Sequence, residues 1–152
     1  MKKNVPRLYK QFVPEQYKLH LSIDEPTMTF TGKVLIKGKK HGRPTKRITL
    51  HQKGLKITSA EVTHHDKKGH VQKELARINK HAKLDEVRLH THETLYPGAY
   101  TVEVTFSGVI TRNMDGMYPC SFEFEGKPDQ LIATQFESHH AREVFPCIDE
   151  PE

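Results

Sequence analysis

Two polar side chains near the end of the chain, Gln135 and Glu137, have the spacing expected of a binding site. They lie at the end of the run from Leu131 to Phe136, which is typical of a short strand. Residues two apart in a strand project from the same face, so an amide and a carboxylate would lie together beside a helical turn. A carboxylate in this position could bind a cation such as an ammonium group. The alternative is that Glu137 caps exposed backbone N–H groups of the turn.

The eleven histidines suggest a metal site, but their spacing completes no ligand set. His90 and His92 could share a metal ion on one face of a strand, and nothing else at ligand spacing joins them. The motif H-E-x-x-H begins at His92-Glu93, but its fifth position is Tyr96. We therefore expect solvated surface histidines, no catalytic residues and no metal ligands in this chain.

The two cysteines, Cys120 and Cys147, are too few for a disulfide framework. We expect two reduced thiols, although spacing alone does not exclude one bridge between them. Cys147 precedes Asp149 and Glu150, whose charges disfavour a reactive thiolate, so we expect a buried structural cysteine.

Alternation of apolar and polar residues with a period of two dominates the chain, which predicts strands. The segment from Val71 to His81 has helix-forming residues but no clean stripe at either period, and we interpret it as a strand. Ser138 is expected to cap a short helical turn from Ala141 to Val144, which Pro146 ends. The other expected strands cover Tyr17–Ile23, Phe30–Ile36, Ile48–Leu50, Leu55–Val62, Val87–Leu89, Tyr100–Phe106, Met117–Phe124 and Leu131–Phe136.

These short strands with turn residues between them predict an all-β fold, an antiparallel β-sandwich or curved open sheet. The length of 152 residues is that of one domain. Leu, Ile, Val and Phe are frequent enough for a folded core, and Gly and Pro, at nine each, exclude collagen-like and linker-like chains.

The net charge of +5 averages two regions of opposite sign. Residues 1–110 hold 21 basic and 10 acidic side chains, whereas residues 111–152 hold three and nine. Seven Lys or Arg residues lie between Lys33 and Arg47, and we interpret them as a solvated strand face and loop. The alternative function is a basic β module that binds nucleic acid or another polyanion.

No run approaches 18 consecutive apolar residues, and Met1-Lys2-Lys3 leads into no apolar stretch of a signal peptide. With two reduced thiols, this predicts a cytoplasmic protein without a membrane partner.

The segment that holds Gln135 and Glu137 reads TQFESHHAREVFPCIDEP from Thr134 to Pro151. It resembles the pattern T-Q-x-E-x-x-x-A-R-x-x-F-P-C-x-D-E-P of the aminopeptidase N family of zinc metallo-aminopeptidases. Weaker matches follow the family order through nearly the whole chain, including Leu95-x-Pro97-Gly98-x-Tyr100 and Met114-x-Gly116-Met117-Tyr118. Tyr9 and the pair Pro119-Cys120 depart from the family pattern, and both concern local structure.

The resemblance implies a saddle-like N-terminal β domain that packs on a thermolysin-like zinc domain. In such enzymes the glutamate matching Glu137 binds the free α-amino group of a peptide, and the matching Gln135 helps line the pocket for its first side chain. Phe145, Pro146, Asp149 and Glu150 would hold the loop in shape and face the next domain.

The family's zinc motif and catalytic residues would all follow Glu152, so residues 1–152 are expected to be an incomplete N-terminal domain. We expect the parent enzyme to use zinc and the chain alone to bind none and to be inactive. The expected partners are a peptide N-terminus and the catalytic domain in cis, with no nucleic acid. Sheet edges left unpaired would favour homo-oligomers.

Overall fold

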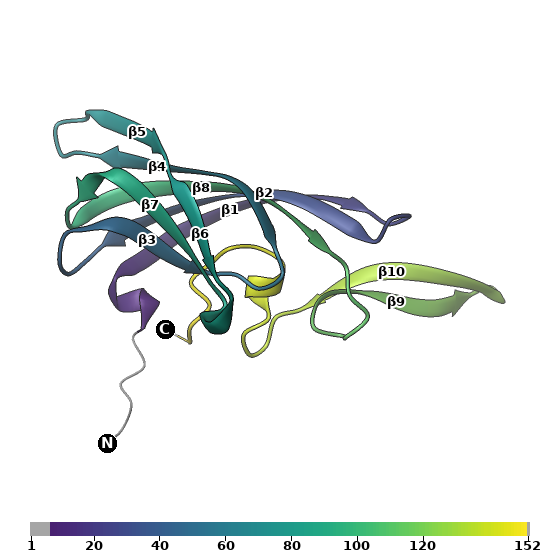
Figure 1. The fold of residues 1–152 in the computed structure, drawn as a ribbon. Helices are drawn as coiled ribbons and strands as arrows, with labels where there is room; N and C mark the ends of the chain where they lie inside the picture. Colours follow the sequence, from purple (N-terminus) through teal and green to yellow (C-terminus); the bar gives the residue numbers. More distant parts are fainter. Residues whose placement is uncertain (1–6, 152) are drawn as a thin grey trace, which may run out of the picture.

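The computed structural model describes residues 7–151, and antiparallel strands make up most of them. Five strands form a long sheet in the order β1–β2–β8–β4–β5 (Figure 1). A three-stranded sheet has the order β3–β7–β6, and β10 pairs with β9 in a separate hairpin. The five-stranded sheet comprises β1 (Phe12–Asp24), β2 (Thr29–Lys40), β8 (Gly98–Val109), β4 (Lys56–His65) and β5 (Val71–Leu75); the others are β3 (Thr45–His51), β7 (Glu86–Leu95), β6 (Arg77–His81), β9 (Gly116–Phe124) and β10 (Lys127–Gln135).

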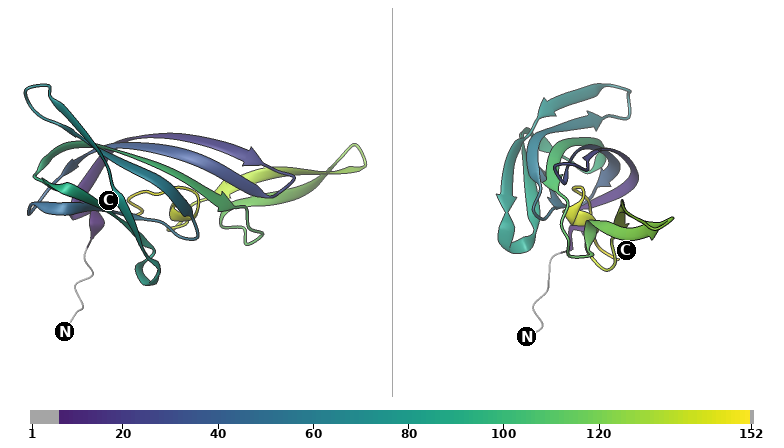
Figure 2. Two further views of the ribbon diagram at one scale, coloured as in Figure 1. Left: turned by 45° about the horizontal axis from the view of Figure 1, so that its top comes forward. Right: turned by 90° about the vertical axis from the view of Figure 1, so that its right-hand side faces the viewer.

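The core lies between the two larger sheets, which face each other (Figure 2). Strand β2 shows the expected alternation, with Phe30, Val34 and Ile36 buried and the intervening residues more exposed. From the other sheet, Leu50 and Leu89 are fully buried. The expected antiparallel all-β fold is therefore confirmed, and its two layers bury their apolar faces against each other.

The segment from Val71 to His81 forms two strands rather than one. Strand β5 pairs with β4 in the five-stranded sheet, whereas β6 pairs with β7 in the three-stranded sheet. Between them, the Ala76 N–H donates to the Ala60 carbonyl at 2.9 Å. The chain thus changes sheets at Ala76, which explains why no single alternation runs through the segment.

Strand β1 is present where alternation predicts it, but several of its apolar side chains are partly exposed. Tyr17, Leu19 and Ile23 are 37%, 39% and 47% exposed. Strand β1 is an edge strand of the long sheet, paired on one side with β2.

The β9–β10 hairpin, called the arm below, extends away from the two larger sheets (Figures 1 and 2). Its base packs on the core through Met117 and Ile132. On the other face, Phe122, Phe124 and Leu131 are exposed. The pairing of Phe124 with Lys127 and of Cys120 with Leu131 places these apolar side chains on one face of the hairpin.

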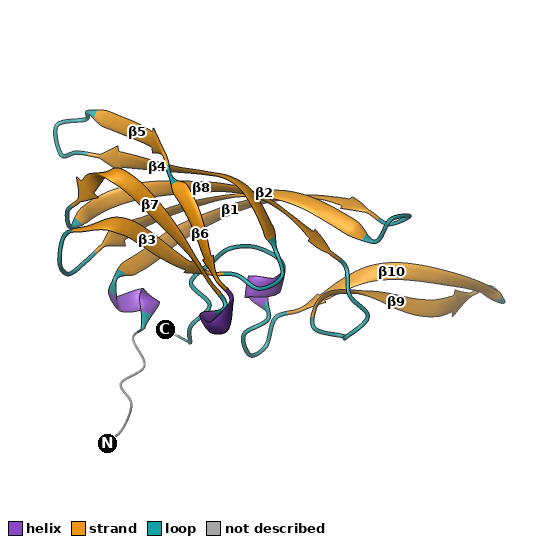
Figure 3. Ribbon diagram, in the orientation of Figure 1, coloured by secondary structure: helices purple, strands orange, loops and turns teal. Residues whose placement is uncertain are grey.

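Three short 3-10 helices complete the described part of the chain (Figure 3). They are η1 (Leu8–Lys10), η2 (Ala82–Leu84) and η3 (Ala141–Glu143). The turn expected near the C-terminus is therefore confirmed, but Ser138 is not its cap. His140 occupies the cap position without a capping hydrogen bond from its side chain, and the Ser138 hydroxyl pairs with Nδ1 of His139 at 2.7 Å.

Within residues 7–151, no helix has the length and apolar character needed to cross a membrane. The first six residues, on which the expectation about a signal peptide depends, lie outside the described residues.

Candidate functional site

Gln135 and Glu137 lie at the base of the arm, where β10 ends and the C-terminal segment begins. Gln135 is the last residue of β10 and pairs with Gly116 of β9. Its side-chain oxygen accepts a hydrogen bond from the Glu137 backbone N–H at 3.4 Å. The two residues are therefore brought together as the sequence predicted, although Glu137 lies just beyond the strand and is joined to Ser138 by a cis peptide bond.

Phe136, between these two residues, is turned toward the protein. It packs against the core, and its ring meets that of Phe145 edge to face at 6.0 Å between centroids. Because Phe136 points inward, Gln135 and Glu137 are both exposed to solvent. The alternation of the strand thus presents the amide and the carboxylate while the aromatic ring anchors the segment.

The carboxylate of Glu137 has no hydrogen bond or ion pair with the described part of the chain. The turn after it is closed by backbone groups instead, because the His140 N–H donates to the Phe136 carbonyl at 2.9 Å. The alternative in which Glu137 caps the turn is therefore wrong. Its charge is therefore unpaired within the described residues.

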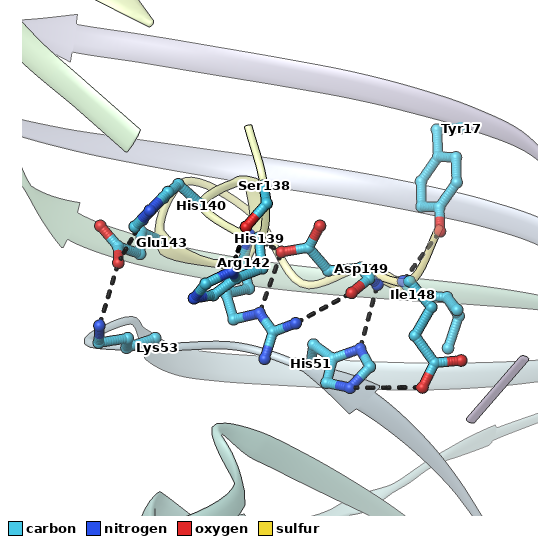
Figure 4. A network of polar contacts seen from close by, with 11 residues as sticks. Tyr17, His51, Lys53, Ser138, His139, His140, Arg142, Glu143, Ile148 and Asp149 are labelled. Atoms are coloured by element: carbon cyan, nitrogen blue, oxygen red, sulfur yellow. Dashed lines mark hydrogen bonds and ion pairs between the residues drawn. The ribbon is translucent and has the colours of Figure 1, made fainter. Parts of the chain in front are cut away.

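The loop that follows Glu137 in the sequence is held by an ion pair between Arg142 and Asp149 (Figure 4). The guanidinium donates from Nε to Asp149 Oδ2 at 3.0 Å and from a terminal nitrogen to the Asp149 carbonyl at 2.9 Å. The Arg142 N–H also donates to Oδ2, at 3.2 Å. Because both side chains are only 12% exposed, this multiple bonding closes residues 142–149 into a stable loop.

His51 attaches this loop to the three-stranded sheet. Its backbone N–H and carbonyl pair with Cys147, and its Nδ1 accepts a hydrogen bond from the Asp149 N–H at 3.0 Å (Figure 4). Burial lowers the pKa of His51, the charge of Arg142 lowers it further, and Glu150 and two other carboxylates oppose this more weakly. The hydrogen bond needs an unprotonated Nδ1, so geometry and electrostatics both favour the neutral ring.

Glu150 connects the loop to the N-terminal segment. Its two carboxylate oxygens accept hydrogen bonds from the backbone N–H groups of Leu8 and Tyr9, at 3.0 and 2.9 Å. These are orphan donors at the start of η1, which a carboxylate satisfies well. Asp149 and Glu150 thus shape the loop from within the domain.

A second polar cluster supports the other side of η3. The Glu143 carboxylate accepts hydrogen bonds from Lys53 at 3.2 Å and from the His140 ring at 3.1 Å (Figure 4). Partial burial acts to raise the pKa of Glu143, but these hydrogen bonds hold it below its ordinary value. Gly116, at the start of β9, is needed beside it, because a Cβ there would lie 3.1 Å from Glu143 and its φ is +66°.

Within residues 7–151, no three His, Cys, Asp or Glu side chains come together as ligands for a metal ion. His90 is half-buried, and burial together with three nearby arginines lowers its pKa. Cys120 and Cys147 are free thiols, and Cys147 is buried as expected. That residues 1–152 hold no metal ligands remains a prediction.

The fold and the site together define an antiparallel all-β domain that ends in a tightly bonded polar loop. Residues 13–152 match the Peptidase M1 N-terminal domain, and the chain belongs to that family. The resemblance inferred from the sequence is thereby confirmed.

Proteins of bacteria, plants and animals are similar to this chain. Aminopeptidase N of Lactococcus lactis subsp. lactis is 40% identical over 153 residues, covering 100% of this chain and 16% of that protein. Aminopeptidase M1 of Arabidopsis thaliana is 32% identical over 149 residues, or 98% of this chain and 17% of that protein. Endoplasmic reticulum aminopeptidase 1 of Rattus norvegicus is 31% identical over 150 residues, with shares of 97% and 16%. The chain thus spans about one sixth of the length of these relatives.

Proposed function

We propose that this chain supplies the segment that recognises the α-amino group in a zinc-dependent aminopeptidase, which removes N-terminal residues from peptides. The observation that carries the proposal is the Glu137 carboxylate, exposed beside Gln135 and without a partner in the described residues. Membership of the Peptidase M1 N-terminal domain family supports the peptidase function.

Glu137 would bind the ammonium group of the peptide's first residue through charge-assisted hydrogen bonds. Gln135, held against the Glu137 N–H, would line the pocket for the first side chain. Binding the free α-ammonium group restricts cleavage to the first residue of a peptide, because an internal residue carries no ammonium group. The rigid loop bonded by Arg142 and Asp149 would keep the carboxylate in place during binding.

The chemistry of hydrolysis would belong to the rest of such an enzyme, where zinc supplies an activated water. We propose that the 152-residue chain by itself binds no catalytic zinc and hydrolyses no peptide. The purified chain can be assayed for zinc content and for hydrolysis of an aminoacyl amide. Stoichiometric zinc together with hydrolysis would overturn this part of the proposal.

The role of Glu137 is tested by Glu137→Gln in the full-length enzyme that contains this chain. Loss of a charged hydrogen bond should lower kcat/KM for an aminoacyl amide by about 10- to 100-fold. Glu123→Gln, an exposed carboxylate on the arm, is the matched control and should leave kcat/KM unchanged. An unchanged kcat/KM for Glu137→Gln would remove Glu137 from the site.

A further inference from the structure

A small hollow with a strongly basic lining lies far along the chain from Glu137, where η1, the end of β2 and the start of β3 meet. Its volume is about 160 Å³. No Asp or Glu lines it. The basic lining residues are Lys10, Lys40, His41, Arg43 and Arg47.

Lys40 is the buried member of this set. It is only 4% exposed, although the expected role of this basic segment was a solvated face and loop. Its ammonium donates to the carbonyls of Arg43 at 2.7 Å and His41 at 3.3 Å, which leaves one of its three N–H groups without a described partner. Burial lowers the pKa of Lys40, because an ammonium without a counter-charge is costly away from water.

Lys39, the neighbour of Lys40 on β2, has a carboxylate partner. Lys39, one residue earlier, points to the other face of β2 and forms an ion pair with Glu15 at 2.7 Å. Within the described residues, neither Lys40 nor Lys10, Arg43 or Arg47 has a carboxylate at ion-pair distance. The Glu150 carboxylate is engaged by the amides of η1.

Arg47, which lines the hollow, also belongs to a basic part of the three-stranded sheet. Arg47 is in register with His90 of β7, which is in register with Arg77 of β6. Burial lowers the pKa of His90, and the charges of Arg77, Arg47 and Arg88 lower it further, so positive charge is concentrated around this ring. The fold therefore keeps an arrangement of cations that a bound anion would stabilise.

We propose that this hollow is a binding site for a phosphate group, either inorganic phosphate or the phosphate of a small metabolite. Lys40 would form the base of the site as a fixed ammonium, and Arg43 and Arg47 would offer guanidinium groups that match phosphate oxygens in pairs. Several converging cations suit a doubly charged anion better than a single carboxylate. This site is separate from the proposed function at Glu137.

The proposal is tested by titrating the isotope-labelled 152-residue chain with inorganic phosphate and then pyrophosphate, with chloride as the ionic-strength control. We expect saturable binding with one site, and the largest amide shifts in residues 10–12 and 40–43. Arg43→Gln, at an exposed position, should weaken binding about tenfold, as expected for loss of charged hydrogen bonds. Lys37→Gln, which removes the same charge from an exposed position on β2, should leave binding unchanged.

Two further measurements keep the test decisive. Lys40→Met should abolish phosphate binding, and a native amide spectrum of that variant shows that the loss is local. A ten-residue oligothymidylate distinguishes the hollow from a diffuse polyanion surface. Absence of saturable phosphate binding, equal weakening by Lys37→Gln, or oligonucleotide binding that far exceeds pyrophosphate binding would each overturn the proposal.

Discussion

His51 is a buried histidine whose protonation should weaken the fold. Its Nδ1 accepts the Asp149 N–H, and burial followed by the Arg142 charge lowers its pKa from 6.5. In the unfolded chain the ring binds a proton near pH 6.5, so below this value the unfolded state takes up more protons than the native state. Stability is therefore complete above about pH 6.5 and falls as pH decreases below it.

We predict a loss of up to about 1.4 kcal/mol per pH unit from this residue just below pH 6.5. His51→Asn should reduce the pH dependence of the free energy of unfolding by the contribution of one proton. The reason is that the Asn carbonyl can accept the Asp149 N–H without titrating. The measurement is urea unfolding at several pH values between 5 and 7.5, with the exposed His20→Asn as control. An equal slope in the native chain and His51→Asn would show that His51 does not couple folding to pH.

The two thiols should differ in reactivity. Cys147 is 3% exposed, and burial followed by the Asp149 charge raises its thiol pKa well above the ordinary value. Cys120 is half-buried on the arm. We predict that a thiol reagent modifies Cys120 first and Cys147 about a hundredfold more slowly, because only an opened state exposes it. Mass spectrometry of the labelled peptides provides the measurement, and equal rates in the native chain would contradict the prediction.

At the residue scale, the site was predictable where its residues are contiguous in the sequence. Gln135, Glu137 and the loop to Glu150 lie in one segment, so their proximity follows from strand and turn geometry. His51 was missed as the loop's partner, because a contact across 98 residues leaves no local pattern. Lys40 was missed for a related reason, since a basic side chain in a basic segment is expected in solvent.

Among the elements, the central strands depend on close approaches between glycines and aromatic rings. Gly32 of β2 lies opposite Phe106 of β8, and a Cβ at Gly32 would lie 2.5 Å from the Phe106 ring. We predict that Gly32→Ala destabilises the fold by about 1–3 kcal/mol, because the ring must move within a packed core. Gly98→Ala, whose nearest contact would be 3.7 Å, is the control in urea unfolding. Equal free energies of unfolding for the two variants would show that the close approach of Gly32 to the Phe106 ring does not limit the side chain at position 32.

Element positions followed well from alternation, and the exceptions have physical causes. Central strands such as β2 and β8 bury every second side chain on one face, so the pattern is clear. Strands β5 and β6 were merged because neither is longer than five residues and the change of sheet occurs at a single alanine. Ser138 looked like a helix cap, but its hydroxyl turns to His139 instead.

The molecule as a whole combines a basic framework with an acidic end. Acidic residues of the last segment are engaged by the framework, as in the pairs of Glu143 with Lys53 and of Glu150 with the amides of η1. Glu137 is the carboxylate of the C-terminal loop that has no described partner. The net charge of +5 therefore describes neither the acidic C-terminal segment nor the basic hollow.

The arm is the part of the described chain where self-association should occur, because β9 and β10 pair only with each other and leave backbone groups free at both edges. Its outer face adds apolar area, with Phe122 42%, Phe124 62% and Leu131 48% exposed. We predict that the 152-residue chain forms dimers or larger species as its concentration rises, measured by light scattering.

Phe124→Lys should raise the dissociation constant about tenfold or more, since burying a phenylalanine contributes roughly 1.5–3 kcal/mol. Val71→Lys, an equally exposed apolar residue on the edge strand β5, is the matched control and should change little. A chain that stays monomeric at high concentration, or one that responds equally to both variants, would show that the arm is not the contact.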